Sequence, residues 1–227
     1  KASVSERFII ACSKFKRISD LIEGMALRNY EYLDQKSDAA PKPFDVEVMG
    51  ADALEQQAEI ETKLAVLDGV FFTRDLTNAP ANVLTTSHFA EQLVALSDLG
   101  LEVEVLEEAE LEKLGMRTLL CVGQGSESPS KVVVMRWTGG GEEAPFALVG
   151  KGVVFDTGGI SLKPAGGMED MTMDMGGAGV VAGVMKALAK RGAKANVVGV
   201  VGLVENMPSG NAVRPGDVIK SMKGDTV

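Results

Sequence analysis

The near-continuous apolar run from Ala195 to Val204 constrains the fold more than any other feature of this sequence. Charged residues bound the run, with Lys194 before it and Glu205 after it. A strand has this composition when helices cover both faces of its sheet, because neither face then needs polar side chains. We therefore expect a sheet buried between helices. A chain of 227 residues with 45% hydrophobic residues can supply a core of that size.

Helical and strand-like segments alternate in the second part of the chain. The sequence predicts helices over 86–99, 107–114 and 176–191, each followed by a glycine that favours helix termination. It predicts strands over 101–106, 118–122, 131–137, 146–149 and 195–204, and a last hairpin that begins with a strand over 217–222. This alternation is typical of an α/β fold with a mixed sheet flanked by helices.

The first part of the chain predicts a smaller α/β unit. A short strand over 8–11 and a helix over 18–30 precede a polar loop over 34–42, and a long helical pattern covers 51–74. The run 77–82, which contains Pro80, then breaks this helix. We expect three parts: residues 1–50 as a remnant of an N-terminal α/β domain, 51–75 as a connecting helix, and 76–227 as the first part of a catalytic domain.

Charge and composition exclude several classes of function. The formal net charge of −9 and an isoelectric point near 4.8 disfavour non-specific binding to nucleic acid or to an anionic membrane. The sequence shows neither an apolar run long enough for a membrane span nor a secretory signal. Cys12 and Cys121 lie in apolar surroundings that favour buried, reduced thiols over a disulfide. These features favour the cytoplasm.

The segment from Val149 to Pro164 is the strongest candidate for a functional site. It begins at the end of a predicted strand, where ligands gather in open α/β sheets, and it combines four glycines with Lys151, Asp156 and Lys163. We expect Gly150 and Gly152 to bend the backbone so that Lys151 and Asp156 converge. Asp174 follows, directly before a predicted helix. Taken singly, these residues could be a surface lysine, a turn former and a helix cap; together they indicate a site. His88 is the only histidine, which excludes a histidine-rich zinc site.

This segment closely resembles the metal-binding signature of the M17 leucyl aminopeptidases. The resemblance implies that Lys151, Asp156 and Asp174 are ligands of one metal ion, with Asp156 bridging to a second. It implies that Lys163 is the catalytic lysine and that Met171 lines the pocket for the substrate's N-terminal side chain. Other stretches carry the same resemblance, namely 168–177, 78–82, 205–211, 214–217 and, more weakly, 23–27.

The resemblance also implies the wider properties of the enzyme. These are two divalent ions (manganese or zinc, with magnesium as an alternative), peptide substrates with a leucine-like N-terminal residue, hydrolysis by a metal-activated water, and a homohexamer. The family's second motif, with two carboxylate ligands and a catalytic arginine, would follow Val227. We therefore expect residues 1–227 to be the middle of a longer enzyme with little peptidase activity alone. The alternatives are a non-catalytic or a DNA-binding regulatory homologue.

Overall fold

The computed structural model describes residues 6–11, 15–39, 44–50 and 54–227. In chain order the elements are β1 (Glu6–Ala11), α1 (Ile18–Asn29), β2 (Phe44–Met49), α3 (Gln57–Asn78), α4 (Thr86–Val94), the 3-10 helix η1 (Ala95–Leu99), β3 (Glu102–Leu106), α5 (Glu108–Lys113), α6 (Arg117–Gly123), β4 (Lys131–Thr138), β5 (Phe146–Asp156), the 3-10 helix η2 (Met168–Met173), α7 (Gly176–Lys190) and β6 (Asn196–Asn206).

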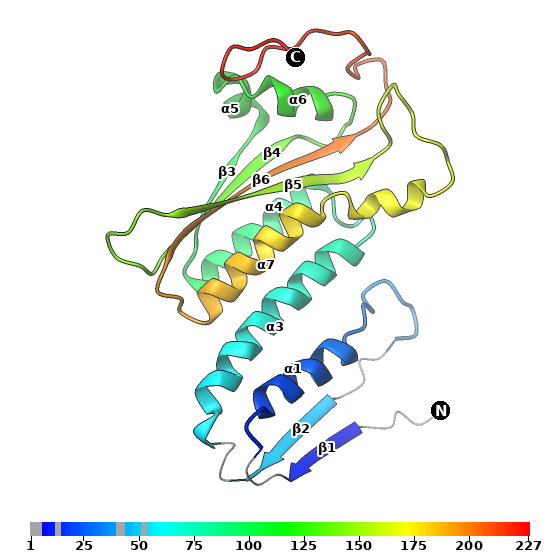
Figure 1. Cartoon of the computed structure of the whole chain (residues 1–227). Helices are drawn as coiled ribbons and strands as arrows, with labels where there is room; N and C mark the ends of the chain where they lie inside the picture. The colour runs from blue at the N-terminus through cyan, green and yellow to red at the C-terminus, as the bar shows by residue number, and fades with distance from the viewer. Residues whose placement is uncertain (1–5, 12–14, 40–43, 51–53) are drawn as a thin grey trace.

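A mixed four-stranded sheet forms the centre of the larger part of the molecule. Its strand order is β3-β4-β6-β5, in which β5 and β6 run parallel and the other neighbours run antiparallel. Helices α4 and α7 cover one face and α5 and α6 lie over the other (Figure 1). The prediction of an α/β fold with a mixed sheet flanked by helices is therefore confirmed.

The apolar run that predicted a doubly covered strand is β6, which lies inside the sheet. Its two faces are buried to different degrees. Val197, Val201 and Leu203 are buried, whereas the alternating residues Val198 and Val200 are only half-buried. The hydrophobic core therefore lies mainly between the sheet and the helices α4 and α7. The face under α6 is covered less completely.

Helix α7 packs unusually close to β5 because both elements carry small residues at the contact. A Cβ atom at Gly150 would lie 2.7 Å from Cα of Ala178 in α7, whereas one at Gly152 would lie 2.6 Å from the carbonyl oxygen of Gly202 in β6 and 3.1 Å from Cβ of Ala178. Glycine is thus required at these two positions by close packing of backbone against backbone. This contact fixes the start of α7 beside the edge strand β5.

Three local predictions differ from the structure. Residues 118–122 belong to helix α6, because a short apolar run does not distinguish a strand from a helix packed on a sheet. Strand β5 continues past 149 to Asp156, so that Lys151 lies in the strand rather than in a glycine-rich loop. Residues 217–222 form no extended strand; the hairpin is reduced to an isolated antiparallel bridge between Lys220 and Thr226.

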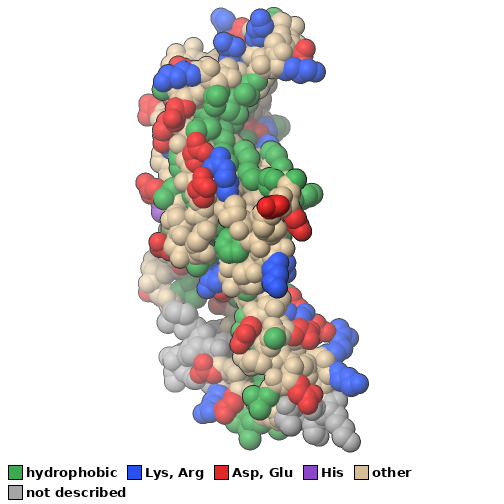
Figure 2. All heavy atoms as spheres, turned by 90° about the vertical axis from the view of Figure 1, so that its left-hand side faces the viewer, with side chains coloured by type: hydrophobic (Ala, Val, Ile, Leu, Met, Phe, Trp, Pro, Cys, Tyr) green, Lys and Arg blue, Asp and Glu red, His purple; other side chains and the backbone are tan. Residues whose placement is uncertain are grey.

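The N-terminal elements form a smaller unit below the sheet (Figure 1). Strands β1 and β2 pair in parallel, and α1 connects them. Helix α3 packs against α1 on one side and against α7 on the other. Figure 2 shows the resulting elongated outline, with acidic and basic side chains interspersed over the face in view. The division into 1–50, 51–75 and 76–227 stays a prediction.

The remaining general predictions concern cysteines and membranes. Cys121 is a free, half-buried thiol whose Sγ lies 3.2 Å from the carbonyl oxygen of Thr118. Cys12 lies outside the described residues. Within the described ranges, no helix is both long enough and apolar enough to cross a bilayer.

Candidate metal centre

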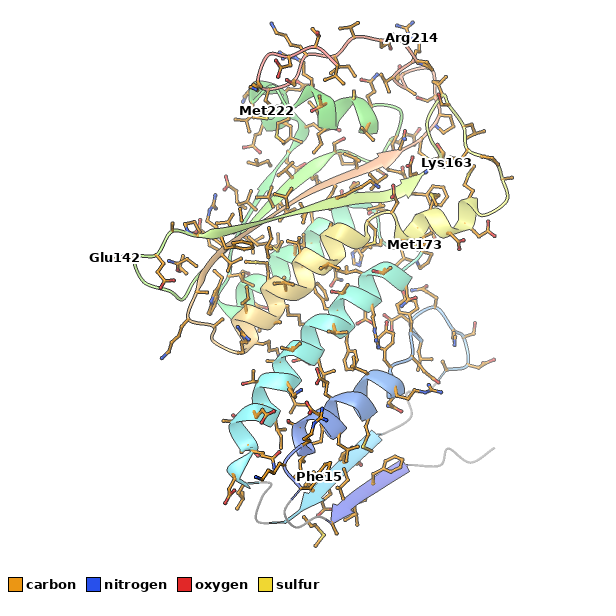
Figure 3. All side chains as sticks on the ribbon, in the orientation of Figure 1. Phe15, Glu142, Lys163, Met173, Arg214 and Met222 are labelled. Atoms are coloured by element: carbon orange, nitrogen blue, oxygen red, sulfur yellow. The ribbon has the colours of Figure 1, made fainter. Side chains whose placement is uncertain are left out.

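Two of the predicted site residues, Asp156 and Lys163, lie at the carboxyl ends of the parallel strands β5 and β6, whereas Lys151 lies in the middle of β5 (Figure 3). Asp156 ends β5, Asn206 ends β6, and the two residues are partners in the ladder. Lys163 lies beside the tip of β5 (Figure 3). The carboxyl ends of parallel strands are where open α/β sheets bind ligands, so this position favours a functional site.

A β-bulge brings Lys151 and Asp156 to the same side of β5. Lys151 pairs with Gly202 and Asp156 with Asn206, but an irregularity between Val153 and Asp156 places one extra residue on β5. A spacing of five, which would point the two side chains to opposite faces, becomes a spacing of four on the ladder. Gly150 and Gly152 lie in the regularly paired part of β5, so the expectation that they bend the chain is wrong; Gly150 makes room for α7 and Gly152 for β6.

Hydrogen bonds surround the carboxylate of Asp156. Lys163 Nζ donates to Oδ2 at 2.7 Å, and Oδ1 accepts from the backbone N–H of Gly158 at 2.9 Å and from Nδ2 of Asn206 at 2.7 Å. Burial alone would raise the pKa of this carboxyl. The hydrogen bonds from Lys163, Gly158 and Asn206 together outweigh burial and hold the pKa below its ordinary value. Asp156 is therefore an anion prepared to face a cation.

The loop after β5 is held by the buried residue Thr157. Its Oγ1 donates to the carbonyl oxygen of Asn206 at 2.8 Å and accepts from the N–H of Gly159 at 3.2 Å. Gly158 and Gly159 both adopt positive φ, at 89° and 67°, which glycine adopts without strain. The N–H of Lys163 then donates to the carbonyl oxygen of Thr157 at 2.9 Å, so the loop returns Lys163 to the end of β5.

Asp174 and Lys151 form a second ion pair of the site. Lys151 Nζ contacts Oδ1 of Asp174 and donates to its backbone carbonyl oxygen at 3.1 Å. The other oxygen of this carboxylate, Oδ2, is buried and has no hydrogen-bond partner in the described structure. A buried carboxylate oxygen without a donor is costly. A bound cation would satisfy it.

The five predicted site residues fall into two connected groups. Lys163 Nζ lies 3.0 Å from Sδ of Met171, which joins Asp156, Lys163 and Met171 into one group, while Lys151 and Asp174 form the other. The backbone links the groups, because the N–H of Asp174 donates to the carbonyl oxygen of Met171 at 3.3 Å. Within the described ranges, no three His, Cys, Asp or Glu side chains form a group that could hold a metal ion.

The donor set nevertheless fits a divalent ion. Each of the two carboxylates forms an ion pair with a lysine ammonium. Positive charge therefore already lies beside the carboxylate oxygens, where a metal cation would also bind. Carboxylate oxygens suit manganese and magnesium as ligands, and zinc accepts both oxygen and nitrogen donors. The unpartnered Oδ2 of Asp174 points to the same chemistry.

Two residues with evident structural roles at the site, Asn206 and Thr157, were not predicted to act there. Both lie within conspicuous segments of the sequence, but no local pattern reveals their contacts with Asp156 and with each other. The available signal is positional: Asn206 comes two residues after the apolar run of β6, so it ends a neighbouring strand at the same edge of the sheet.

Comparison with known families identifies the larger part of the chain. Residues 71–227 match the model of the cytosol aminopeptidase family, catalytic domain (peptidase family M17). The chain belongs to this family. The predicted resemblance is thereby confirmed, and the match starts within α3, a few residues before the predicted boundary at 76.

Curated relatives and solved structures of the family agree with this assignment. The chain is 63% identical to a probable cytosol aminopeptidase of Dinoroseobacter shibae over 98% of its own length and 46% of the relative's. It is 51% identical to one from Rhizobium rhizogenes, over 93% of the chain and 44% of the relative. The chain therefore spans about half the length of the curated relatives it matches.

Two solved structures show the same fold. A leucine aminopeptidase of Caenorhabditis elegans has a TM-score of 0.84 with this chain. The two are 29% identical, and the match covers 97% of this chain and 45% of the other. The bottromycin maturation enzyme BotP, solved in complex with Mn, has a TM-score of 0.83 and 36% identity over 92% of this chain and 44% of the other. These likenesses do not favour the alternative of a non-catalytic or DNA-binding homologue.

Proposed function

We propose that this chain carries part of the active site of a metal-dependent aminopeptidase, which releases N-terminal residues from peptides. Lys151, Asp156 and Asp174 would hold one divalent ion, and Asp156 would be shared with a second. The observation that carries the proposal is the buried, unpartnered Oδ2 of Asp174 beside Lys151. The carboxylate of Asp156, whose hydrogen bonds hold its pKa below the ordinary value, supports it. Family membership supplies the reaction class.

The residues of the chain would take distinct roles. Bound divalent ions supply Lewis-acid activation of water and of the peptide carbonyl. Lys151 can act as a ligand only as a neutral amine, so its proton must leave when metal binds. The ammonium group of Lys163 would stabilise the oxyanion that develops on the substrate carbonyl. Met171, whose sulfur contacts Lys163, offers a soft apolar wall suited to a leucine-like side chain.

The identity of the metal and the assembly belong to the same proposal. Manganese is favoured because the BotP relative was solved with Mn, and zinc and magnesium are alternatives. A homohexamer in the cytoplasm is proposed from the family resemblance and from relatives named cytosol aminopeptidases. Light scattering coupled to size-exclusion chromatography measures the mass of the assembly, and a monomer at micromolar concentration would contradict the hexamer for this polypeptide.

The proposal predicts a specific metal dependence. Residues 1–227 offer three candidate ligands to one ion and only Asp156 to the second. We expect the polypeptide alone to bind Mn²⁺ weakly and to hydrolyse leucine anilide slowly. Calorimetric titration with Mn²⁺ should show saturable binding with proton release, and Asp174→Asn should abolish it, since it removes an anionic ligand. Asp170→Asn, at an exposed acidic residue of η2, is the matched control and should bind as the wild type does.

One result would contradict the proposed site, and another would contradict only the expected weakness of the isolated polypeptide. Equal Mn²⁺ binding by wild type and Asp174→Asn would remove Asp174 from the site. Rapid, Mn²⁺-dependent turnover by residues 1–227 would refute the expectation of weak activity, and it would show that these residues suffice for catalysis.

A further inference from the structure

The side-chain amide of Asn206 lies against the carboxylate of Asp156. Asn206 ends β6 and pairs with Asp156 in the parallel ladder, and the two lie fifty positions apart in the sequence. In-register neighbours on parallel strands project to the same face of the sheet. The ladder itself therefore delivers the amide to the carboxylate, and Nδ2 of Asn206 donates to Oδ1 of Asp156 at 2.7 Å.

Asn206 is itself held from two sides. Its backbone carbonyl oxygen accepts from the N–H of Thr157 at 3.0 Å and from Oγ1 of Thr157 at 2.8 Å. Across the loop, a Cβ atom at Gly159 would lie only 2.9 Å from Oδ1 of Asn206, and Gly159 has φ of 67°. The space for the amide thus depends on a glycine in a conformation that other residues rarely adopt. The amide is fixed in place before any ligand arrives.

The two oxygens of Asp156 have different partners as a result. Oδ1 accepts from two neutral donors, the N–H of Gly158 and Nδ2 of Asn206, whereas Oδ2 faces the ammonium of Lys163. The neutral donors fix the rotation of the carboxylate without competing for its charge. Oδ2 remains the oxygen that faces positive charge.

We propose that Asn206 is a positioning residue that orients Asp156 so that Oδ2 faces the divalent ion. This inference rests on the proposed role of Asp156 as a metal ligand. Groups that hydrogen-bond to metal ligands orient them, and their removal weakens metal binding about 10- to 100-fold. An aspartate at 206 would keep the shape of the side chain, but it would replace a donor with a second negative charge beside Asp156.

Two substitutions at Asn206 and matched substitutions at Asn196 test the inference. Asn206→Leu removes the hydrogen-bond donor. Asn206→Asp also removes it but keeps the shape of the side chain, so it serves as the second variant if Asn206→Leu does not fold. Asn196 begins the same strand, and its amide bonds to Gly140, Gly141 and Glu143 away from the site. Asn196→Leu and Asn196→Asp therefore show how the loss of a hydrogen-bonded amide elsewhere on β6 affects stability and Mn²⁺ affinity. Thermal unfolding establishes that each variant is folded.

The readouts are metal-free crystal structures and Mn²⁺ titration by calorimetry. We expect the Asp156 carboxylate to rotate away from its wild-type orientation in the Asn206 variants and Mn²⁺ affinity to fall about 10- to 100-fold. The Asn196 variants should retain both the orientation and the affinity. An unchanged Asp156 orientation and unchanged Mn²⁺ affinity in the Asn206 variants would overturn the inference. Rotation of Asp156 in a chain whose wild type binds no Mn²⁺ would uphold the positioning role and overturn the proposed metal function instead.

Discussion

The sheet region and the N-terminal unit are stabilised in different ways. Buried apolar side chains fill the space between the sheet and the helices α4 and α7. Among the described residues of the N-terminal unit, only Ile18 and Ser19 of α1 are fully buried, and polar contacts attach the unit to α3. Lys63 bridges Asp20 and Glu23 there, at 2.6 Å and 2.5 Å. These ion pairs are partly open to solvent, and ion pairs near the surface contribute less to stability than apolar burial does. The N-terminal unit should therefore open at lower free energy than the sheet region.

Replacing one leucine by alanine in each region should give the largest difference in the free energy of unfolding between the two regions. Leu93 of α4 is fully buried in the core, whereas Leu21 of α1 is 39% exposed. We expect Leu93→Ala to lower the free energy of unfolding by about 2–5 kcal/mol, because it leaves a cavity. Leu21→Ala should cost less than about 1 kcal/mol. Urea unfolding followed by circular dichroism measures both values, and equal losses would refute the contrast.

Substitution of one glycine in each region should change stability in opposite directions. At Gly183 of α7, an added Cβ would lie 2.1 Å from Oγ1 of Thr73 and 2.5 Å from the carbonyl oxygen of Gly69, so α3 would have to move. Gly183→Ala should cost about 1–3 kcal/mol through overpacking. Gly24 of α1 has no atom within 4 Å of an added Cβ. Gly24→Ala should stabilise by about 0.4–1 kcal/mol, because it restricts the unfolded chain.

Thermal unfolding of the two alanine variants checks this pair of predictions. An increase in the melting temperature for Gly24→Ala together with a decrease for Gly183→Ala is expected. A stabilised Gly183→Ala variant would show that the contact between α3 and α7 is looser than the structure indicates.

The smallest effect concerns the attachment of the N-terminal unit at alkaline pH. Burial, together with a hydrogen bond to Asp75 at 2.7 Å, raises the pKa of Tyr30 from 10.0 to about 12. The folded protein therefore holds this proton more tightly than the unfolded chain. The stability gained is fully present below pH 10 and is lost as the pH rises towards about 12.

Comparison with Tyr30→Phe isolates this contribution. The variant keeps an aromatic ring to stack on Phe71 but has no titrating hydroxyl. The difference in unfolding free energy between wild type and variant should decrease across this pH range, measured by urea unfolding at several pH values. A difference that stays constant with pH would show that the hydroxyl does not contribute through its proton.

Periodicity and the chemistry of one segment predicted most of what positions the site. The apolar run of β6 and the glycine stops of the helices predicted the mixed sheet, because burial on two faces and helix termination leave local signals. The sequence suggested that glycines bend the chain between Lys151 and Asp156, whereas a β-bulge puts both residues on one side of β5, and a bulge depends on pairing with β6. The contact between Asn206 and Asp156 was not predicted at all. It depends on the register of two strands whose paired residues lie far apart in the chain.

Strand β5 has a consequence for how this polypeptide behaves in solution. It is the last strand in the sheet order, and Phe146 and Val149 on it are 68% and 80% exposed. In the part of the chain that the structure describes, no strand pairs with the outer edge of β5, and such an edge is a template for another strand. Concentrated samples should therefore self-associate or precipitate unless some polypeptide covers that edge. Because Lys151 and Asp156 belong to the same strand, whatever covers the edge also lies close to the candidate metal centre.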